Sequence, residues 1–201
     1  GAKLLIGNDT RLDLALFHVS TRDELVVDSA FGGRTSYRNA SRTRRNGVEL
    51  EADTKWTSSL SSHFALTRLL AEYAADFTTG AATIDAGNRL PGVPATTLFG
   101  DLVWKHAASG ISAAVEGIYR SEVYVEDTNQ KPAAPEYVLV NLRVGFEQRS
   151  GGWKLGEFVR LENLFDQHYI GSVIVGDSNQ RYYEPAPGRT WLAGVSAGYT
   201  F

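Results

Sequence analysis

The last twelve residues of the chain alternate between two kinds of side chain up to the C-terminus. Every second position from residue 191 is apolar, whereas the positions between them carry mostly small or polar side chains. A period of two residues is that of a β-strand, in which successive side chains point to opposite faces. Chain ends are usually polar and poorly ordered, so a patterned strand at the terminus needs an explanation. The apolar positions are Trp191, Ala193, Val195, Ala197, Tyr199 and Phe201.

The same alternation recurs along the chain. In 137–148, for example, Val138, Leu142 and Val144 alternate with Arg143 and Glu147. Eight segments show this pattern well or fairly, and a short ninth precedes them. We therefore expect an all-β protein with antiparallel strands. The segments are 1–6, 11–19, 47–56, 63–73, 96–106, 111–120, 137–148, 153–165 and 190–201.

One segment also fits a helix. Residues 63–77, "HFALTRLLAEYAADF", are rich in Ala, Leu and Glu, which favour helices. Because the segments around it alternate with a period of two, we predict a strand here as well.

The connections between these segments alternate between short and long. Short connections, with turn-forming residues, lie near Asn8 and at 57–62, 107–110 and 149–152. Long ones are expected at 23–37, 76–95, 123–136 and 171–188. Short turns at one end and long loops at the other are typical of outer-membrane barrels, whose strands need only about 9–11 residues to cross the bilayer. Phe201 then falls at the periplasmic end, since the last strand follows a long loop.

Three tryptophans lie next to short connections. Trp56, Trp104 and Trp153 would form part of an aromatic girdle at the membrane–water interface, with Phe201 on the same rim. The alternative is that these side chains cap strand ends in a soluble β-sandwich.

Composition excludes several classes of protein. Of the 201 residues, 43% are hydrophobic and 21% are charged, which argues against disorder. The net charge of −3 provides no field that would attract nucleic acid. The chain contains neither cysteine nor methionine. Without an initiator methionine, we expect it to be a processed protein or a piece of a longer one.

No arrangement of residues predicts catalysis, a metal site or a cofactor. The four histidines lack the spacing of known metal motifs. The basic cluster 42–45, "RTRR", could contact lipopolysaccharide phosphates or simply form a solvated strand face. Five acidic residues are expected to face the water-filled side of a barrel wall. They are Glu49, Glu51, Asp53, Asp101 and Glu116.

The long segment 171–188 is the best candidate for ligand contact. It carries Arg181, Tyr182 and Tyr183, which suit anionic, catechol-like or macrocyclic metal chelates through stacking and hydrogen bonding. Tyr124 in the preceding long segment is a further candidate. Aromatic side chains also pack loops against one another, and composition alone leaves that alternative open.

Several motifs, taken together and in order, resemble the C-terminal part of TonB-dependent outer-membrane receptors. "NGVELEADTKW" resembles a recurring strand opening of the family, and "RLPGVPATT" resembles its Pro-Gly-x-Pro entry to a strand. "NLFDQHY" (163–169), "PAPGRTW" (185–191) and the final "AGYTF" resemble the end of the family's barrel. The resemblance extends over essentially the whole chain.

The resemblance implies a transmembrane barrel of 22 strands that is filled by an N-terminal plug domain. Residues 1–201 would then be a single, incomplete domain: the last eight or nine strands, without the plug and without the segment that contacts TonB. The implied function is import of a ferric siderophore or related metal chelate across the outer membrane of a Gram-negative bacterium. This part alone is not expected to transport. No enzymatic activity is expected.

The resemblance also gives the terminal strand a role. A last strand ending in Phe resembles the signal that the barrel assembly machinery reads. Its residues here would be Trp191, Val195, Tyr199 and Phe201. The expected partners are therefore this machinery, outer-membrane lipid, the plug, TonB and the chelate.

Two other readings remain open at this stage. The first is a self-contained, eight-stranded outer-membrane barrel with a structural or adhesive role, since eight strands are enough to close. The second is a soluble β-rich binding domain, such as a carbohydrate-binding sandwich. The sandwich requires the apolar side chains to be buried in a core, whereas the membrane readings leave them facing lipid.

Overall fold

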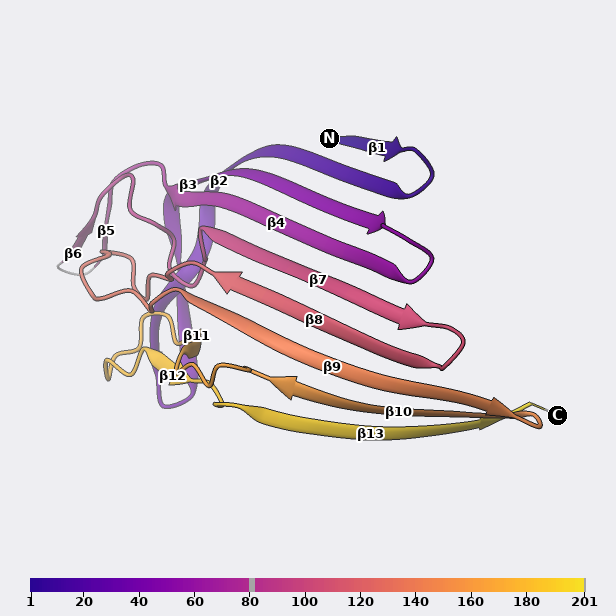
Figure 1. Cartoon of the computed structure of the whole chain (residues 1–201). Coiled ribbons are helices and arrows are strands. Elements are labelled where there is room, and N and C mark those ends of the chain that lie inside the picture. Colours follow the sequence, from indigo (N-terminus) through magenta and orange to yellow (C-terminus); the bar gives the residue numbers. More distant parts are fainter. Residues whose placement is uncertain (80–81, 201) are drawn as a thin grey trace.

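A computed structural model, which describes residues 1–79 and 82–200, shows one curved antiparallel sheet of nine strands (Figure 1). The strands follow in the order β1-β2-β3-β4-β7-β8-β9-β10-β13. Their bounds are β1 (Ala2–Ile6), β2 (Thr10–Phe31), β3 (Arg34–Lys55), β4 (Leu60–Tyr73), β7 (Thr96–His106), β8 (Ile111–Arg120), β9 (Tyr137–Ser150), β10 (Trp153–Glu162) and β13 (Thr190–Tyr199). The all-β, antiparallel prediction is confirmed, and β4 is a strand. The sheet is open, because within the described residues β1 and β13 do not pair with each other.

Two short ribbons lie inside the long connections. β5 (Phe77–Thr79) pairs with β6 (Ala82–Ile84), and β11 (Ile170–Val173) pairs with β12 (Tyr183–Pro185). The sequence pattern did not predict these four strands. Among the described residues there is no helix of the length and apolarity needed to cross a membrane.

The register gathers the apolar side chains on one face of the sheet. Residues directly opposite each other on paired strands share a face. One row across six strands is entirely apolar or aromatic, and we call its side the apolar face. The row consists of Leu14, Leu50, Leu66, Leu98, Tyr119 and Val138.

The other side of the sheet, the polar face, carries charged and hydrogen-bonding groups. A row on this face crosses the same six strands and contains no apolar side chain. It consists of Arg11, Asp53, His63, Asp101, Glu116 and Asn141. The acidic residues that the sequence placed together on one side therefore do share a face.

The short connections lie together at one end of the sheet, which we call the short-turn end (Figure 1). Positive φ angles of 63° at Gly7, 54° at Gly151 and 84° at Gly152 form two of these turns. Glycine adopts such angles without the steric cost that a Cβ atom would impose. The long connections lie at the opposite end, the long-loop end.

The prediction of an unpaired loop at 23–37 is wrong. β2 and β3 remain paired as far as Phe31 and Arg34, and the chain reverses at Gly32 and Gly33, whose φ angles are 57° and 76°. The pairing satisfies the main-chain polar groups that a loop would leave to water. We call residues 24–40 of this hairpin the strap.

The strap departs from the direction of the sheet. Its base lies next to Asp23, which has a φ of 54°. Figure 1 shows the far halves of β2 and β3 turning away from the other strands and passing behind the long connections.

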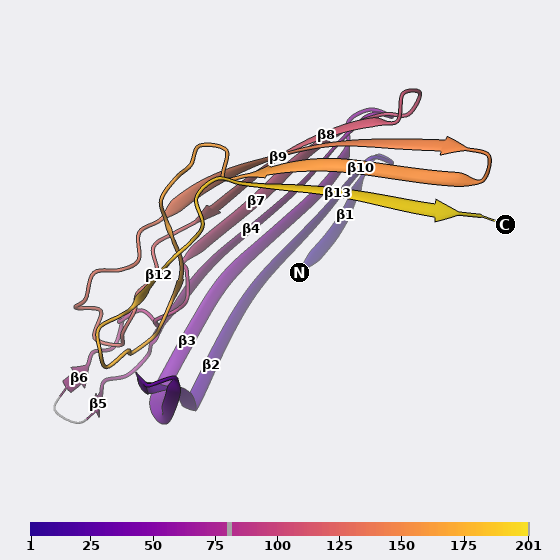
Figure 2. The same cartoon turned by 90° about the horizontal axis from the view of Figure 1, so that it is seen from below.

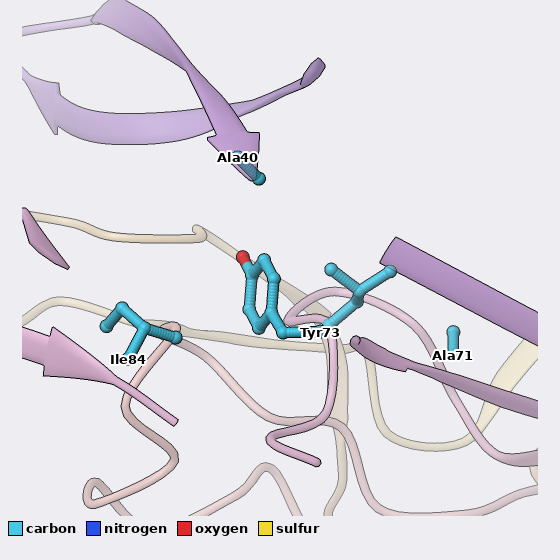
Figure 3. Packing of buried hydrophobic residues seen from close by; sticks show 5 residues of the cluster. Ala40, Ala71, Tyr73 and Ile84 are labelled. Carbon is cyan, nitrogen blue, oxygen red and sulfur yellow. The ribbon is translucent and has the colours of Figure 1, made fainter. Parts of the chain in front are cut away.

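The buried core lies at the long-loop end, because a single-layer sheet has no interior of its own. It consists of Ala40 from the strap, Ala71 and Tyr73 from β4, and Ile84 and Leu90 from the following connection. In Figure 3 the ring of Tyr73 lies between Ile84 and Ala71, with Ala40 close by. This cluster fixes the strap and the first long connection to the end of β4.

Candidate functional site

Three long connections and the strap come together at the long-loop end, and we call this region the loop assembly (Figure 2). Its connections are residues 74–95, 121–136 and 163–189. Long loops on a rigid sheet are where binding residues are concentrated in proteins. The loop assembly is therefore the candidate functional site.

Asp127 joins three parts of the loop assembly. Its carboxylate accepts a 2.7 Å hydrogen bond from the hydroxyl of Tyr73. The same carboxylate forms an ion pair with Arg38 of the strap, whose Nη2 lies 2.5 Å away. Its main-chain carbonyl accepts a 3.0 Å hydrogen bond from the side chain of Asn88. The side chains of Arg38 and Asp127 are only 17% and 10% exposed, so this pair is screened little by water.

The tip of the strap is tied to the last long connection by main-chain hydrogen bonds. The N–H of Ala30 donates to the carbonyl of Gly176 over 3.1 Å, and the N–H of Ser178 donates back to Ala30 over 3.0 Å. Gly176 in turn donates to Val125 over 2.9 Å. The strap therefore holds the second and third long connections in place.

Of the predicted contact residues, Tyr182 and Tyr183 lie close together but in different environments. Tyr182 is only 8% exposed, and burial raises the pKa of its hydroxyl. Tyr183 is 37% exposed, and its hydroxyl donates a 2.6 Å hydrogen bond to the carbonyl of Pro132. Arg181 is exposed. Arg181 and Tyr183 are thus the accessible members of the set.

Tyr124 lies in a different place. It lines a cavity of about 680 Å³ together with Arg68, Arg89 and Glu122. The structure therefore does not place all four predicted contact residues in one cavity, and their role in ligand binding stays a prediction.

The side chain of Glu126 holds the second long connection together by hydrogen bonds to residues of the same connection. Its carboxylate accepts hydrogen bonds from the N–H groups of Thr128, Gln130 and Lys131, at 2.7, 2.7 and 3.1 Å, and from the hydroxyl of Thr128. Burial acts to raise the pKa of this carboxyl, but the hydrogen bonds favour its ionised form more strongly and leave the pKa below its usual value. The ionised carboxylate therefore shapes this connection.

On the polar face, three side chains could together hold a cation. Glu51, Asp53 and His63 place one ligand atom each within 4.8 Å of one another, and Nδ1 of His63 lies 2.8 Å from Asp53. No metal-binding spacing within a single segment of the sequence indicates this group. Asp53 and His63 are neighbours only through the pairing of β3 with β4.

The motif "NLFDQ" forms a closed turn after β10. Asn163 adopts a φ of 51°, and its side chain both accepts from and donates to the main chain of Gln167, at 2.9 and 2.8 Å. Its own N–H donates a 2.9 Å bond to the side chain of Asn141. The turn is thereby fixed to the polar face.

The same motif meets "PGR" at the start of the last strand. Oδ1 of Asp166 accepts a 2.7 Å hydrogen bond from the N–H of Arg189. A Cβ atom on Gly188 would approach that oxygen to 2.7 Å, which explains why the motif has glycine there. The two motifs whose order suggested the family are therefore in contact.

The three predicted girdle tryptophans all lie at the short-turn end. Trp56, Trp104 and Trp153 are 62%, 41% and 51% exposed. The ring of Trp153 lies 5.1 Å from that of Tyr199, directly opposite on β13. An interfacial role for these side chains agrees with this position and stays a prediction.

Three of the predicted assembly residues, Trp191, Val195 and Tyr199, lie on the apolar face of the terminal strand. Trp191 and Val195 are 70% and 80% exposed. Phe201 lies outside the described residues. Recognition of this strand by the barrel assembly machinery stays a prediction.

Comparison with known proteins identifies the fold. A family described as TonB dependent receptor-like, beta-barrel matches residues 1–164. The siderophore receptor PiuA from Acinetobacter baumannii superposes with a TM-score of 0.74 at 21% identity, over 96% of this chain and 27% of PiuA. The ferric yersiniabactin uptake receptor FyuA from Yersinia pestis gives a TM-score of 0.69 at 21% identity, over 96% of this chain and 28% of FyuA.

A third structure agrees with these two. BauA, the ferric preacinetobactin receptor from Acinetobacter baumannii, gives a TM-score of 0.72 at 14% identity, over 97% of this chain and 28% of BauA. The chain therefore spans little more than a quarter of the length of each of these receptors. The resemblance drawn from the motifs is confirmed: this chain belongs to the TonB-dependent receptor-like β-barrel family.

Proposed function

We propose that this chain is the C-terminal part of the barrel wall of an outer-membrane receptor that imports a ferric siderophore or a related metal chelate in a TonB-dependent manner. The observation that supports this most directly is the separation of apolar and polar side chains onto opposite faces across six neighbouring strands of the sheet. Members of the family are outer-membrane β-barrels of Gram-negative bacteria, and we propose that location for this chain.

The dimensions of the strands support a membrane wall. β7 has 11 residues, and β8, β10 and β13 have 10 residues each. A tilted strand of about 9–11 residues crosses the hydrocarbon core of an outer membrane. Short turns at one end and the loop assembly at the other agree with periplasmic and extracellular ends, respectively.

The alternative readings find less support. A soluble sandwich needs a second layer on the apolar face, and the described residues provide none. A self-contained eight-stranded barrel needs its outer strands to pair, whereas the described sheet has nine strands and stays open. A larger barrel, completed by further strands, accounts for both features.

The polar face would then line the lumen and contact a plug domain. Its ion pairs already satisfy part of its charge: Arg160 bonds Glu116 at 2.8 Å, and Lys154 bonds Glu147 at 3.0 Å. Coupling to TonB would reside in the plug region, so we assign transport to the whole receptor and not to this part alone. The last strand would carry the signal for the barrel assembly machinery.

The chelate class rests on similarity of fold together with the chemistry of the loop assembly. The three solved relatives named above are a siderophore receptor, a ferric yersiniabactin uptake receptor and a ferric preacinetobactin receptor. Arg181 and Tyr183 are exposed groups that suit an anionic or catechol-like ligand.

Growth of a deletion strain under iron limitation tests the proposal. The strain is supplied with a panel of ferric siderophores, haem and other metal chelates, one at a time. We expect growth to fail on one chelate and to be restored by the full-length gene. Unchanged growth and unchanged uptake of labelled chelates across the panel would refute the import function.

A further inference from the structure

We infer that the polar face carries a binding site for a divalent transition-metal ion, with zinc as the best fit, formed by Glu51 and Asp53 of β3 and His63 of β4. The site lies toward the short-turn end of the sheet, away from the loop assembly. The inference does not depend on the import function, because it rests on the pairing of two strands and on the chemistry of three side chains.

The register of the sheet brings the three side chains together. Glu51 and Asp53 are two residues apart on β3, so they share a face, and His63 lies directly opposite Asp53 on β4. Each residue places one ligand atom within 4.8 Å of the ligand atoms of the other two. Two ligands of a tetrahedral zinc ion, with bonds of about 2.1 Å, lie about 3.4 Å apart. Rotation of these side chains about their own bonds therefore suffices to place all three ligand atoms on one ion.

The donor set selects the class of metal. Carboxylate oxygens and an imidazole nitrogen are ordinary ligands of zinc, and three such protein ligands with a water molecule in the fourth position complete its tetrahedron. Calcium and magnesium bind through oxygen ligands, so the imidazole favours a transition metal over these two ions. The site is therefore expected to prefer zinc to calcium.

The imidazole of His63 is held in position by two neighbours. Its Nδ1 lies 2.8 Å from Oδ1 of Asp53, and its ring is tilted against the ring of Phe99, with the two centroids 5.8 Å apart. The side chains of His63 and Asp53 are 32% and 49% exposed, so an ion from solution can reach them. A metal ion binds to deprotonated ligands, and here it would replace the proton shared between Nδ1 and the carboxylate.

Glu51 has a carboxylate that no other contact occupies. It is exposed, and it makes no hydrogen bond or ion pair with another described residue. Arg11 lies directly opposite Asp53 on β2, but its guanidinium is paired with Asp13, which also pairs with Lys3 over 3.5 Å. The nearby cations are thus already held by a carboxylate outside the site.

A further carboxylate adds negative charge to this part of the face. Asp101 lies directly opposite His63 on β7, and its Oδ1 accepts a 3.2 Å hydrogen bond from the N–H of His63. Lys55 lies in the neighbouring row and, like Asp101, makes no ion pair with another described residue. The three carboxylates around the imidazole therefore carry more negative charge than this one lysine offsets, and a divalent cation would neutralise the surplus.

A cavity beside these side chains has room for the ion. Its volume is about 430 Å³, and its lining includes Asp53, His63 and Asp101 together with Thr10 and Ser61. A water molecule has about 30 Å³ of liquid volume, so a metal ion and the water that completes its coordination fit into this space. The site is thus open on one side, which is typical of zinc sites that keep an exchangeable position.

Zinc binding by the full-length receptor and by the double variant Asp53→Asn/His63→Gln tests the inference. Both proteins carry a purification tag without histidine, are stripped of metal with a chelator, and are dialysed against zinc. Bound zinc is counted per receptor by elemental mass spectrometry, and its affinity is measured by competition with a coloured zinc chelator. We expect the double variant to hold one zinc ion fewer than the wild type, because two of the three ligands are lost.

The single variant Glu51→Gln separates loss of the metal from loss of the fold. Its side chain gives up no hydrogen bond or ion pair with another described residue, so the protein should fold like the wild type. We expect this variant to bind the same zinc ion about tenfold more weakly, because a neutral amide replaces a carboxylate ligand.

A second double variant, Asp85→Asn/His106→Gln, is the matched control. It removes one carboxylate and one imidazole, as the test variant does, but Asp85 lies in the first long connection and His106 at the end of β7. Both residues are exposed, and neither belongs to the site. This control should bind zinc like the wild type.

Three results would overturn the inference. The first is equal zinc content and affinity in the wild type, the Asp53→Asn/His63→Gln variant and the Glu51→Gln variant. The second is an equal loss of zinc from the control variant. The third is binding of calcium as tightly as zinc by the wild type, which would show that the imidazole does not act as a ligand.

Discussion

The hydroxyl of Tyr73 donates a 2.7 Å hydrogen bond to the carboxylate of Asp127, which lies 54 residues later in the chain. Tyr73 is fully buried at the end of β4, and Asp127 belongs to the connection between β8 and β9. Since Asp127 also pairs with Arg38 of the strap, this carboxylate links a wall strand to a loop and to the strap. Three parts of the loop assembly therefore meet at one carboxylate.

Replacement of Tyr73 by Phe tests this dependence. The ring and its packing stay, whereas the hydrogen bond to a charged acceptor is lost, at a cost of about 1.5–3 kcal/mol. We expect amide hydrogen exchange in residues 121–136 to become at least about tenfold faster, with exchange in β9 and β10 unchanged. Tyr37→Phe on the exposed side of the strap is the control and should leave these rates as they are. Equal protection of 121–136 in both variants would contradict the proposed role of Tyr73.

A second prediction concerns a glycine that lies under an aromatic ring. Phe17 on β2 lies directly opposite Gly47 on β3, and a Cβ atom on Gly47 would come within 2.1 Å of the ring. Gly47→Ala should therefore displace Phe17 and lower the free energy of unfolding by about 1–3 kcal/mol. At Gly198 a Cβ atom would meet nothing within 4 Å, so Gly198→Ala should have little effect. Urea titration of the receptor in lipid measures the free energy of unfolding of both variants. If Gly47→Ala and Gly198→Ala lower it equally, the ring of Phe17 does not pack on Gly47.

Much of the wall could be predicted from the sequence. These predictable features are the strand positions, the alternation of faces and the short turns. Each depends only on residues that are close together in the sequence, because a two-residue period and turn-forming residues show within a few positions. The apolar face of 138–146 and the acidic residues of the opposite face follow from the same rule. Even Glu157, which interrupts the alternation in the sequence, lies on the apolar face, opposite Phe146 and Val195.

The loop assembly could not be predicted in this way. The strap looked like a loop because its pairing depends on a bend at Asp23 and a reversal at two glycines, and not on alternation. The bond between Tyr73 and Asp127 joins a strand to a loop 54 residues later, and the proximity of Asp53 to His63 depends on the register between β3 and β4. Register is a property of the folded sheet, set by hydrophobic patterning and by turn geometry together.

Glu157 provides a test of the membrane location itself. Its side chain is exposed on the apolar face and makes no hydrogen bond or ion pair with another described residue. In hydrocarbon a carboxylate at this depth is unfavourable, so Glu157→Leu should stabilise the receptor by about 1–2 kcal/mol in bilayers. The matched variant Glu147→Leu removes ion pairs with Arg149 and Lys154 from the polar face and should bring no gain. A folding titration in lipid vesicles in which Glu157→Leu lowers stability would show that this face does not contact lipid.

The pKa of Glu126 predicts how the loop assembly responds to acid. Since folding lowers this pKa, the ionised carboxylate stabilises the fold above its ordinary pKa, and this contribution is lost as the pH falls through the lowered value. Glu126→Gln should therefore increase protease cleavage within 121–136 at about pH 7, where the wild-type carboxylate is ionised. The difference between variant and wild type should shrink as the pH falls below about 4. A difference that persists unchanged at low pH would mean that the charge of Glu126 is not responsible.

The link between Ala30 of the strap and Gly176 has a geometric consequence for the sheet as a whole. β2 lies near one edge of the sheet and β13 forms the other, with six strands between them, yet main-chain bonds from the strap to the segment before β13 span that distance directly. Among the described residues, the two sides of the sheet are thus connected at the long-loop end, although β1 and β13 do not pair. The first strands are therefore joined to the segment before the last strand at the long-loop end, whereas no such bond among the described residues joins them at the short-turn end.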